Sequence, residues 1–472
     1  LWLNSSKVLM LTTIYRFKWI WFYFTFFSLI SCAHYLNYEA DIMIQNENPI
    51  ISNSLWSATA NPTSDFLPLS DSIEADVAVI GAGFSGLSTA LHLAQAGQRV
   101  VVLEAQTPGW GASGRNGGQV NPGLIQDPSH AISKFGSEMG RRMIKMSGDA
   151  GRLVFELIAK NEIQCDVRPV GWIRAAHNDA GLKGLVRIAK QWAAYGIEME
   201  VLDKAKIADL LGTGAYIGGI IDPRGGNIHP LNYALGLAEA AHRAGAKIFG
   251  HSKAETLVSN ADGHCITTSS GSVRTAKVVV CTNAYTGDLI PGLRQTVVPI
   301  RSIQVATVPM SDNLRSSVLP GLHAPSDTRR LLSYFRTDAH GRFLMGARGA
   351  YSEAATKVRL AEARKMTRDI FPQLNDMRWE YEWGGFVAAT RDQYPHLNDL
   401  GNGIVAGLGY NGRGVAMATA MGKVLADWAI GVPAGELDFV VTPLRRIPFH
   451  GLHRLGVAAT LARYKLMEKI AS

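Results

Sequence analysis

The sequence has little cysteine: four residues in a chain of 472, with no CxxC pair among them. The wide spacing of Cys32, Cys165, Cys265 and Cys281 argues against a disulfide framework and provides no set of zinc ligands. Cys281 lies in the apolar run VVVCT, where a small buried thiol is the expected role. We therefore expect no metal site, a reducing compartment and a cytoplasmic protein.

Charge is also scarce, at 18% of the residues, while hydrophobic residues reach 47%, a balance that excludes disordered and fibrous classes. The net charge of +8 is concentrated towards the C-terminus. Residues 441–472 contain a single acid, Glu468, and the basic residues Arg445, Arg446, Arg454, Arg463, Lys465 and Lys469. No basic stripe with interleaved aromatic residues covers the rest of the chain, so we expect no nucleic-acid partner.

Long apolar runs are lacking as well. The most apolar one, residues 19–31, is short for a membrane span and unusually aromatic for a signal peptide. Because the chain begins with Leu1, translated upstream sequence is the favoured interpretation of residues 1–42, with a natural start near Met43. A signal or lipoprotein segment and a membrane anchor are the alternatives, and they leave a membrane-bound or exported form open. Residues 43–72 are polar and are expected to form a surface arm.

A complete βαβ unit begins at Asp76. The run DVAVI leads into the turn GAGFSG at 81–86, a helical pattern ends at Gly97, and a second strand ends at Glu104. Such glycines permit a tight turn, close approach of the backbone to a pyrophosphate, and close packing of helix on strand. The helix N-terminus points free N–H groups at the phosphates, and the Glu104 carboxylate suits the ribose hydroxyls. We predict a bound dinucleotide and disfavour NADP, whose 2′-phosphate the carboxylate would repel.

Two further glycine-rich segments favour FAD over NAD. Residues 111–119, GASGRNGGQ, follow the second strand closely enough to line an extended cofactor. Residues 407–414, GLGYNGRG, precede a helical pattern at 415–430, whose N-terminus suits the electron-rich pyrimidine edge of a reduced flavin. On the residues alone, the alternative for this last segment is a structural turn.

Together these motifs resemble the D-amino-acid oxidase superfamily of flavoproteins, and within it most the γ-glutamylputrescine oxidase branch. The similarity includes VVVCTNAYT at 278–286 and GYNGRGVAMATAMGKVLADWA at 409–429, and it runs from Asp76 to the C-terminus. The resemblance implies a two-domain α/β fold. A glutathione-reductase-type Rossmann FAD-binding domain is interleaved with a substrate domain built on an antiparallel or mixed β-sheet.

The resemblance also implies which residues hold a noncovalent FAD. Glu104 is expected at the ribose, and Ala254 at the adenine through its backbone. The pyrophosphate is assigned to Gly81, Gly83, Phe84, Ser85 and Gly86, the flavin side to Ser113, Gly114, Arg115, Asn116, Gly117 and Gly118, and the pyrimidine end to Gly409, Gly412, Arg413 and Gly414. Many relatives have His where this chain has Arg413, which keeps a positive charge beside the reduced flavin at every physiological pH.

Two departures from the family pattern bear on the substrate. Glycine and D-amino-acid oxidases clamp an α-carboxylate with an arginine where this chain has Val387, and glycine oxidase has another where this chain has Tyr410. Simple α-amino acids are therefore disfavoured. Sarcosine oxidase relatives attach FAD through a cysteine at the Val387 position, so noncovalent FAD is expected here. The remaining candidates for the substrate pocket are Trp172, Arg301, Tyr334, Arg336 and Trp383, although a structural role is favoured for each, as it is for His229 and Asp392.

The implied reaction is oxidation of a small amine of the γ-glutamylputrescine type. Hydride passes to flavin N5, and the resulting imine is hydrolysed to an aldehyde and ammonia. Oxygen, which gives hydrogen peroxide, or a quinone reoxidises the flavin. We expect no catalytic residue, because the cofactor carries the chemistry. Two alternatives stay open: a D-amino-acid or sarcosine-type dehydrogenase that passes electrons to quinone, and a non-catalytic flavin-binding protein.

The chain is expected to alternate between the two domains. The segments are the extension (1–42), the arm (43–72), the FAD-binding domain (73–160, 225–298 and 383–440), the substrate domain (161–224 and 299–382) and a basic helical tail (441–472). For the tail, a helix docked on the body of the protein is favoured over one that lies on an anionic membrane surface.

Overall fold

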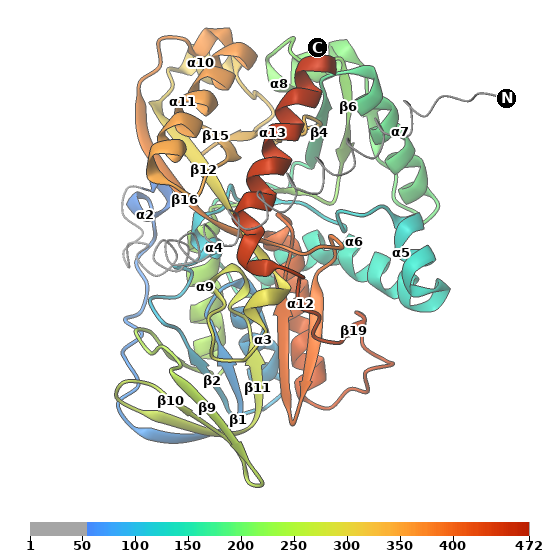
Figure 1. Cartoon of the computed structure of the whole chain (residues 1–472). Helices are drawn as coiled ribbons and strands as arrows, with labels where there is room; N and C mark the ends of the chain where they lie inside the picture. Colours follow the sequence, from blue (N-terminus) through green and yellow to red (C-terminus); the bar gives the residue numbers. More distant parts are fainter. Residues whose placement is uncertain (1–53, 472) are drawn as a thin grey trace, which may run out of the picture.

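The computed structural model describes residues 54–471 and contains two large β-sheets in two domains (Figure 1). The first sheet, in the lower half of the view, has the strand order β19-β17-β18-β11-β1-β2-β8 and is extended by β10 and β9. Its strands are β1 (Ser72–Ile80), β2 (Val100–Leu103), β8 (Lys247–Phe249), β9 (Thr256–Asn260), β10 (Gly263–Thr267), β11 (Ser272–Val280), β17 (His396–Gly401), β18 (Ile404–Leu408) and β19 (Val441–Thr442). The central run β18-β11-β1-β2-β8 is parallel throughout, which confirms the Rossmann-type sheet.

The second sheet lies above the first and has the order β16-β12-β15-β14-β13-β4-β6-β5. Its strands are β4 (Trp172–Ala176), β5 (Glu200–Leu202), β6 (Gly218–Asp222), β12 (Val298–Pro309), β13 (Ser326–Asp327), β14 (Tyr334–Thr337), β15 (Arg342–Arg348) and β16 (Trp379–Ala389). All neighbours are antiparallel except β13 and β4, so the sheet is mixed, as expected for the substrate domain. A separate short ladder joins β3 (Gln119–Val120) and β7 (Gly226–Asn227).

Helices cover both sheets. They are α2 (Leu55–Ala58), α3 (Phe84–Gln95), α4 (Ala112–Arg115), α5 (Pro128–Phe135), α6 (Ser137–Lys160), α7 (Asp179–Ala193), α8 (Lys204–Leu211), α9 (Pro230–Arg243), α10 (Asp312–Ser317), α11 (Glu353–Ile370), α12 (Gly414–Ala429) and α13 (His453–Ala471). Short 3-10 turns occur at Asn283–Tyr285, Arg294–Thr296, Pro372–Leu374 and His450–Leu452. The sequence also predicts a helix that begins at Pro230 and ends at Gly245, and a charged helix near 358–370, and the structure has both, as α9 and α11.

The core of the FAD-binding domain depends on small residues. α3 and α12 pack against each other, because Ser88 and Gly422 bring the two backbones together: a Cβ at Gly422 would lie 2.5 Å from the Ser88 Cβ. The Ser88 hydroxyl donates to the Thr419 carbonyl oxygen over 2.7 Å. Both helices therefore sit directly on the parallel sheet, and their N-termini reach the carboxyl ends of its strands.

The chain passes between the two sheets several times. β4 and β6 belong to the second sheet, α9 and β8 to β11 to the first, and β12 to β16 to the second again. β16 pairs with β12 from Trp379 to Ala389, so the expected boundary between 382 and 383 falls inside this strand.

Most of residues 54–71 are exposed, as expected for a surface arm, but four apolar side chains anchor the arm in the core. Leu55 and Trp56 are fully buried, and Phe66 and Leu69 also lie in the core. The arm then follows α9: the Asn61 N–H donates to the Asn232 side chain over 2.8 Å. These anchors were not predicted, because four apolar side chains spread over a polar segment show no periodicity.

The C-terminal helix α13 runs along the body of the protein (Figure 1). His450 bonds to the Val297 carbonyl oxygen over 2.8 Å, and the Arg454 guanidinium lies 5.1 Å from the centre of the Tyr351 ring. These contacts support the prediction that the C-terminal tail is a helix docked on the body of the protein. None of the described helices is long and apolar enough to cross a membrane. The apolar run at 19–31 and Cys32 lie outside the described residues.

Candidate functional site

The first glycine turn joins β1 to α3 in the geometry that a pyrophosphate requires. Gly81 has φ +102°, a conformation that side chains rarely adopt, and a Cβ at Gly86 would lie 1.9 Å from the Gly81 carbonyl oxygen. Gly83 is the N-cap of α3 and offers no side-chain cap. The helix therefore presents its first N–H groups and its positive dipole end at the carboxyl end of β1.

Glu104 follows β2 and is held in place from two sides. One carboxylate oxygen accepts the Ala82 N–H over 2.8 Å, and the other accepts the Gln106 N–H over 2.9 Å. Burial raises the pKa of Glu104, although these hydrogen bonds act in the opposite direction. Ala254 lies nearby, because the Ser252 N–H donates to the Glu104 carbonyl oxygen over 2.7 Å. A carboxylate and a backbone segment therefore meet beside the glycine turn, as adenosine binding requires.

The segment 111–119 contacts the same helix start. The Ser113 hydroxyl accepts the Phe84 N–H over 2.9 Å, so this loop and the pyrophosphate turn are in direct contact. Asn116 folds the loop back on itself: its side-chain oxygen Oδ1 accepts the Gly118 N–H over 2.8 Å, and its side-chain amide donates to the Ser113 carbonyl oxygen over 2.7 Å. The short helix α4 and the loop after it thus form one rigid unit, which we call the 111–119 loop.

The substrate sheet lies directly against the 111–119 loop. The Trp383 indole N–H and the Gln304 amide both donate to the Arg115 carbonyl oxygen, over 3.0 and 2.6 Å. Arg336 donates to the Gly117 carbonyl oxygen over 3.3 Å. The structure therefore brings Trp383 and Arg336 into contact with the 111–119 loop. Gln304 was not expected from the sequence, where a single amide in the apolar run SIQVATV is its only signal.

One row of paired residues crosses this sheet. Strand registers join Trp383 to Gln304, Gln304 to Gly346, Gly346 to Tyr334, Tyr334 to Ser326, and Ser326 to Arg174. Because directly paired residues point to the same face, this face carries the pocket candidates Trp383, Tyr334 and, two residues before Arg174, Trp172.

Two of the remaining pocket candidates lie on opposite faces. Val387 lies four residues after Trp383 and shares its face. Arg301 lies three residues before Gln304 and pairs with Phe386, so it points to the other face of the sheet, away from the row.

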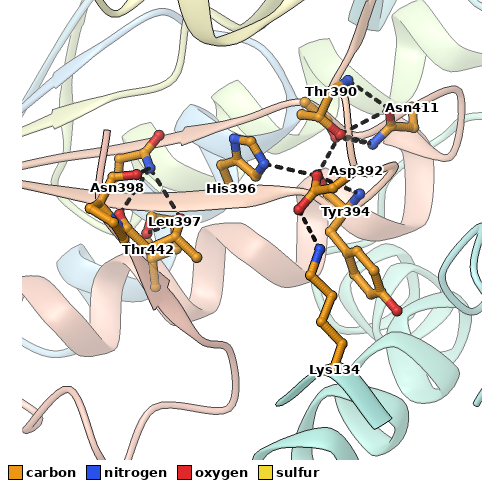
Figure 2. Close-up of polar contacts among 11 residues, drawn as sticks. Lys134, Thr390, Asp392, Tyr394, His396, Leu397, Asn398, Asn411 and Thr442 are labelled. Carbon is orange, nitrogen blue, oxygen red and sulfur yellow. Dashed lines mark hydrogen bonds and ion pairs between the residues drawn. The ribbon is translucent and has the colours of Figure 1, made fainter. Parts of the chain in front are cut away.

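The second glycine turn, residues 407–414, is braced by polar side chains (Figure 2). Asn411 has φ +52° and exchanges hydrogen bonds with Thr390: its carbonyl oxygen accepts the Thr390 N–H over 2.8 Å, and its amide donates to the Thr390 hydroxyl over 3.0 Å. The Gly409 N–H donates to the Asn283 side chain over 2.9 Å. Tyr410 is buried, and its hydroxyl donates to the Gly407 carbonyl oxygen, so it is part of the turn itself.

Asp392 connects this turn to α5. It accepts hydrogen bonds from Lys134 over 2.6 Å and from His396 over 3.0 Å (Figure 2). Partial burial raises the pKa of the Asp392 carboxyl, but these two donors outweigh it and bring the pKa below its ordinary value. Asp392 thus has a bracing role, in agreement with the structural role favoured for it.

Arg413 is the N-cap of α12 but turns its side chain towards the substrate sheet. The guanidinium donates to the Pro122 carbonyl oxygen over 2.6 Å and lies 5.0 Å from the centre of the Trp172 ring. Burial, and then repulsion from Arg174, lower the pKa of Arg413 to about 9. The guanidinium is still charged at neutral pH.

The N-terminal arm also reaches the 111–119 loop. The Trp56 indole N–H donates to the Asn116 carbonyl oxygen over 2.8 Å, and the ring meets His229 edge to face at 4.8 Å. His229 caps α9 by accepting the Asn232 N–H over 3.1 Å, and its other ring nitrogen bonds to Thr59 over 3.0 Å. Trp56 was not predicted, because it lies in a segment of polar composition that shows no apolar periodicity.

The arrangement fits FAD. A glycine cradle opens at the start of α3, a fixed carboxylate lies beside it, and a second helix, α12, begins at a glycine turn with Arg413 as its N-cap. Residues 76–428 match the family described as FAD dependent oxidoreductase. The chain belongs to this D-amino-acid oxidase (DAO) family. The predicted FAD-dependent oxidoreductase is thereby confirmed.

Relatives of known sequence agree with the resemblance. The γ-glutamylputrescine oxidoreductase of Escherichia coli is 34% identical over 425 residues, which cover 89% of this chain and 99% of the relative. The probable oxidoreductase OrdL of Haemophilus influenzae is 34% identical over 385 residues, covering 80% and 88%.

Solved structures share the fold at lower identity. Glycine oxidase from Geobacillus kaustophilus has a TM-score of 0.65 at 22% identity and covers 79% of this chain and 99% of that one. L-amino acid deaminase from Proteus vulgaris has a TM-score of 0.64 at 18% identity and covers 86% and 100%. The two-domain α/β fold is thus confirmed.

Proposed function

We propose that this enzyme oxidises a small amine of the γ-glutamylputrescine type with a noncovalently bound FAD. The observation that carries the proposal is the side chain at Val387, on the loop-facing side of β16, where the related amino-acid oxidases have a guanidinium. A carboxylate next to the reacting carbon would therefore find no guanidinium with two parallel N–H donors at this position. The 34% identity to a γ-glutamylputrescine oxidoreductase over nearly the whole chain supports the same substrate class.

The chain's own residues position and enclose the reactants. The α3 turn and Glu104 are assigned to the pyrophosphate and ribose, and the 111–119 loop and the 407–414 turn to the flavin. When bound, FAD supplies the two-electron acceptor for the carbon next to the amine nitrogen. The buried side chains of Trp383 and Gln304 and the half-buried Tyr334 form a wall beside the 111–119 loop, which would exclude water from the reacting carbon. We assign no acid or base, since a neutral amine needs none.

Noncovalent binding follows from the residue at 387, because valine has no nucleophilic atom for a flavin link. Acid precipitation of the purified holoenzyme should therefore release all the FAD into the supernatant. Yellow colour retained in the pellet would contradict this assignment.

Anaerobic mixing with candidate amines tests the activity. We expect γ-glutamylputrescine to bleach the flavin absorbance faster than putrescine, sarcosine or D-alanine. Bleaching by D-alanine or sarcosine alone would favour the amino-acid dehydrogenase alternative, and bleaching by none of the four would favour a non-catalytic flavin protein. Hydrogen peroxide on admission of air identifies oxygen as the acceptor; slow reoxidation by air but fast reoxidation by a quinone identifies a dehydrogenase.

A further inference from the structure

Three arginines gather where the substrate sheet approaches the start of α12. Arg174 lies on β4, Arg224 follows β6, and Arg413 caps α12. The Trp172 ring connects two of them: the Arg174 and Arg413 guanidinium carbons lie 5.5 and 5.0 Å from its centre. Both are within the range of a cation–π contact.

The single carboxylate of this cluster is already used. Asp222 accepts two hydrogen bonds from Arg224, over 2.9 and 2.7 Å, and its side chain is only 3% exposed. Within residues 54–471, no carboxylate lies at ion-pair distance from Arg174 or Arg413. Arg413 donates only to the carbonyl oxygens of Pro122 and Gly123. The cluster therefore holds two guanidiniums that make no direct ion pair within the described residues, although the charge of Asp222 favours both.

Arg174 and Arg413 are both half-buried, and this partial burial makes their charges costly. It lowers the pKa of Arg174 to about 10, and the pKa of Arg413 falls to about 9 through burial and then through repulsion from Arg174. Both groups stay protonated at neutral pH, so the unfavourable energy persists in the folded protein. An anion that contacts both guanidiniums would remove it, and a carboxylate matches their planar donors best.

The arginine cluster lies on the face of the substrate sheet that contacts the 111–119 loop. Arg174 ends the row that begins at Trp383 and Gln304, the two side chains bonded to the Arg115 carbonyl oxygen. Tyr334, which would touch any side chain placed at Gly117, stands two strands from Arg174 in this row. Adjacent strands are about 4.8 Å apart, so Arg174 lies roughly 10 Å along the sheet from the wall of the 111–119 loop.

That distance suits a substrate with a remote acidic end. In γ-glutamylputrescine about nine bonds separate the oxidised carbon from the α-carboxylate, the length of three extended residues or roughly 10 Å. We propose that Arg174 and Arg413 bind a carboxylate of the substrate that is remote from the oxidised C–N bond. This inference rests on the proposed function, and it explains how the chain recognises an acidic substrate without an arginine at position 387.

Substitution of Arg174 with Gln in the holoenzyme tests the proposal. Under anaerobic conditions, we expect Arg174→Gln to raise the Kd of γ-glutamylputrescine at least tenfold and to leave its limiting rate of flavin reduction within about twofold. The parameters for putrescine, which has no carboxylate, should not change. Arg413→Gln should also raise the Kd of γ-glutamylputrescine, but because Arg413 is assigned to the flavin as well, no unchanged rate is expected of this variant and its FAD content is measured first. Arg330→Gln, an exposed arginine after β13, is the matched control and should change neither amine.

Two results would overturn the proposal: an equal effect of Arg174→Gln on both amines, or no effect on either. If Arg413→Gln lost FAD but kept an unchanged Kd for γ-glutamylputrescine, Arg413 would bind the cofactor alone. The proposal that Arg174 and Arg413 bind the carboxylate together would then be wrong. Calorimetric titration of the holoenzyme with glutamine, which has the α-carboxylate, and with glutaminamide, which lacks it, tests the carboxylate site independently of the proposed amine oxidation. If no amine reduces the flavin, but glutamine alone binds and Arg174→Gln abolishes this binding, the proposed function fails and the carboxylate site stands.

Discussion

Thr390 and Asn411 each act as donor and acceptor for the other, over 2.8 Å from the Thr390 N–H and 3.0 Å from the Asn411 amide. The pair joins the end of β16 to the turn before α12, so a strand of the substrate sheet fixes a loop of the FAD-binding domain (Figure 2). The Thr390 hydroxyl also donates to the Tyr394 carbonyl oxygen over 2.7 Å, which connects the pair to Asp392 and α5. The start of α12 is therefore positioned by both domains.

Asn411→Gly tests this brace, because glycine accepts the positive φ and removes only the side-chain hydrogen bonds. We expect the Kd of FAD to rise about fivefold, equivalent to about 1 kcal/mol for the lost hydrogen bonds. Flavin fluorescence during titration of the apoprotein measures it. Asn402→Gly is the matched control: Asn402 also has a positive φ, at +50°, but is exposed in the turn between β17 and β18. An equal effect of the two substitutions would contradict the assigned brace.

Gly86→Ala tests the contact between α3 and the turn that precedes it. The new Cβ would lie 1.9 Å from the Gly81 carbonyl oxygen, so the helix must move away from the strand. We expect a loss of about 3 kcal/mol in the free energy of unfolding, together with loss of FAD from the purified protein. Gly184→Ala in α7 is the control, since a Cβ there has no neighbour within 4 Å. Chemical denaturation compares the two; retained FAD in Gly86→Ala would contradict the proposed cradle.

The sequence was most informative where a local motif determines the structure. The turn at 81–86, Glu104 and the α9 start at Pro230 are each specified by a few neighbouring residues, and the structure has them where they were expected. A βαβ unit combines chain direction, turn conformation and helix start in about thirty residues, so little tertiary information is needed.

Contacts between distant segments could not be predicted in this way. Trp56 meets Asn116, and Gln304 meets Arg115, across 60 and 189 positions of the chain, and neither partner shows a local pattern. The faces of β12 and β4 depend on the strand register, which places Arg174 in the row with Gln304 and points Arg301 away from it. Sequence reasoning therefore found the cofactor motifs but missed the residue on which the carboxylate proposal depends.

Glu104→Gln tests the assignment of Glu104 to the ribose of FAD. Glutamine keeps the size and one acceptor oxygen, but it removes the charge that strengthens a hydrogen bond to a ribose hydroxyl, and its NH2 group must face one of the two N–H donors, Ala82 or Gln106. We expect the Kd of FAD to rise about tenfold, since hydrogen bonds to charged groups contribute about 1.5 kcal/mol or more. Equilibrium dialysis of the apoprotein with FAD gives the Kd. Glu74→Gln, an exposed carboxylate on β1, should leave it unchanged; an unchanged Kd in Glu104→Gln would assign the ribose elsewhere.

His229→Asn tests a pH dependence that arises where the N-terminal arm meets α9. Burial, and then the charge of Arg336, lowers the pKa of His229 to about 3 from an ordinary 6.5. Its Nδ1 accepts the Asn232 N–H, its Nε2 bonds to Thr59, and the Trp56 ring covers it, so protonation would turn the helix cap into a second donor. The unfolded chain takes up a proton below pH 6.5 while the folded protein does not, so stability falls as the pH is lowered from 6.5 towards 3.

Between pH 7 and pH 5 this single group should cost the wild-type protein about 2 kcal/mol of its free energy of unfolding. Asparagine at position 229 still caps α9 but does not titrate, so His229→Asn should gain about that amount relative to the wild type over the same interval. Denaturant unfolding of both holoproteins at several pH values measures the difference. His251→Asn, at an exposed histidine, should follow the wild-type curve. If the His229→Asn curve also ran parallel to the wild type, His229 would titrate alike in the folded and unfolded chains, and the buried contact between the arm and α9 would not exist in solution.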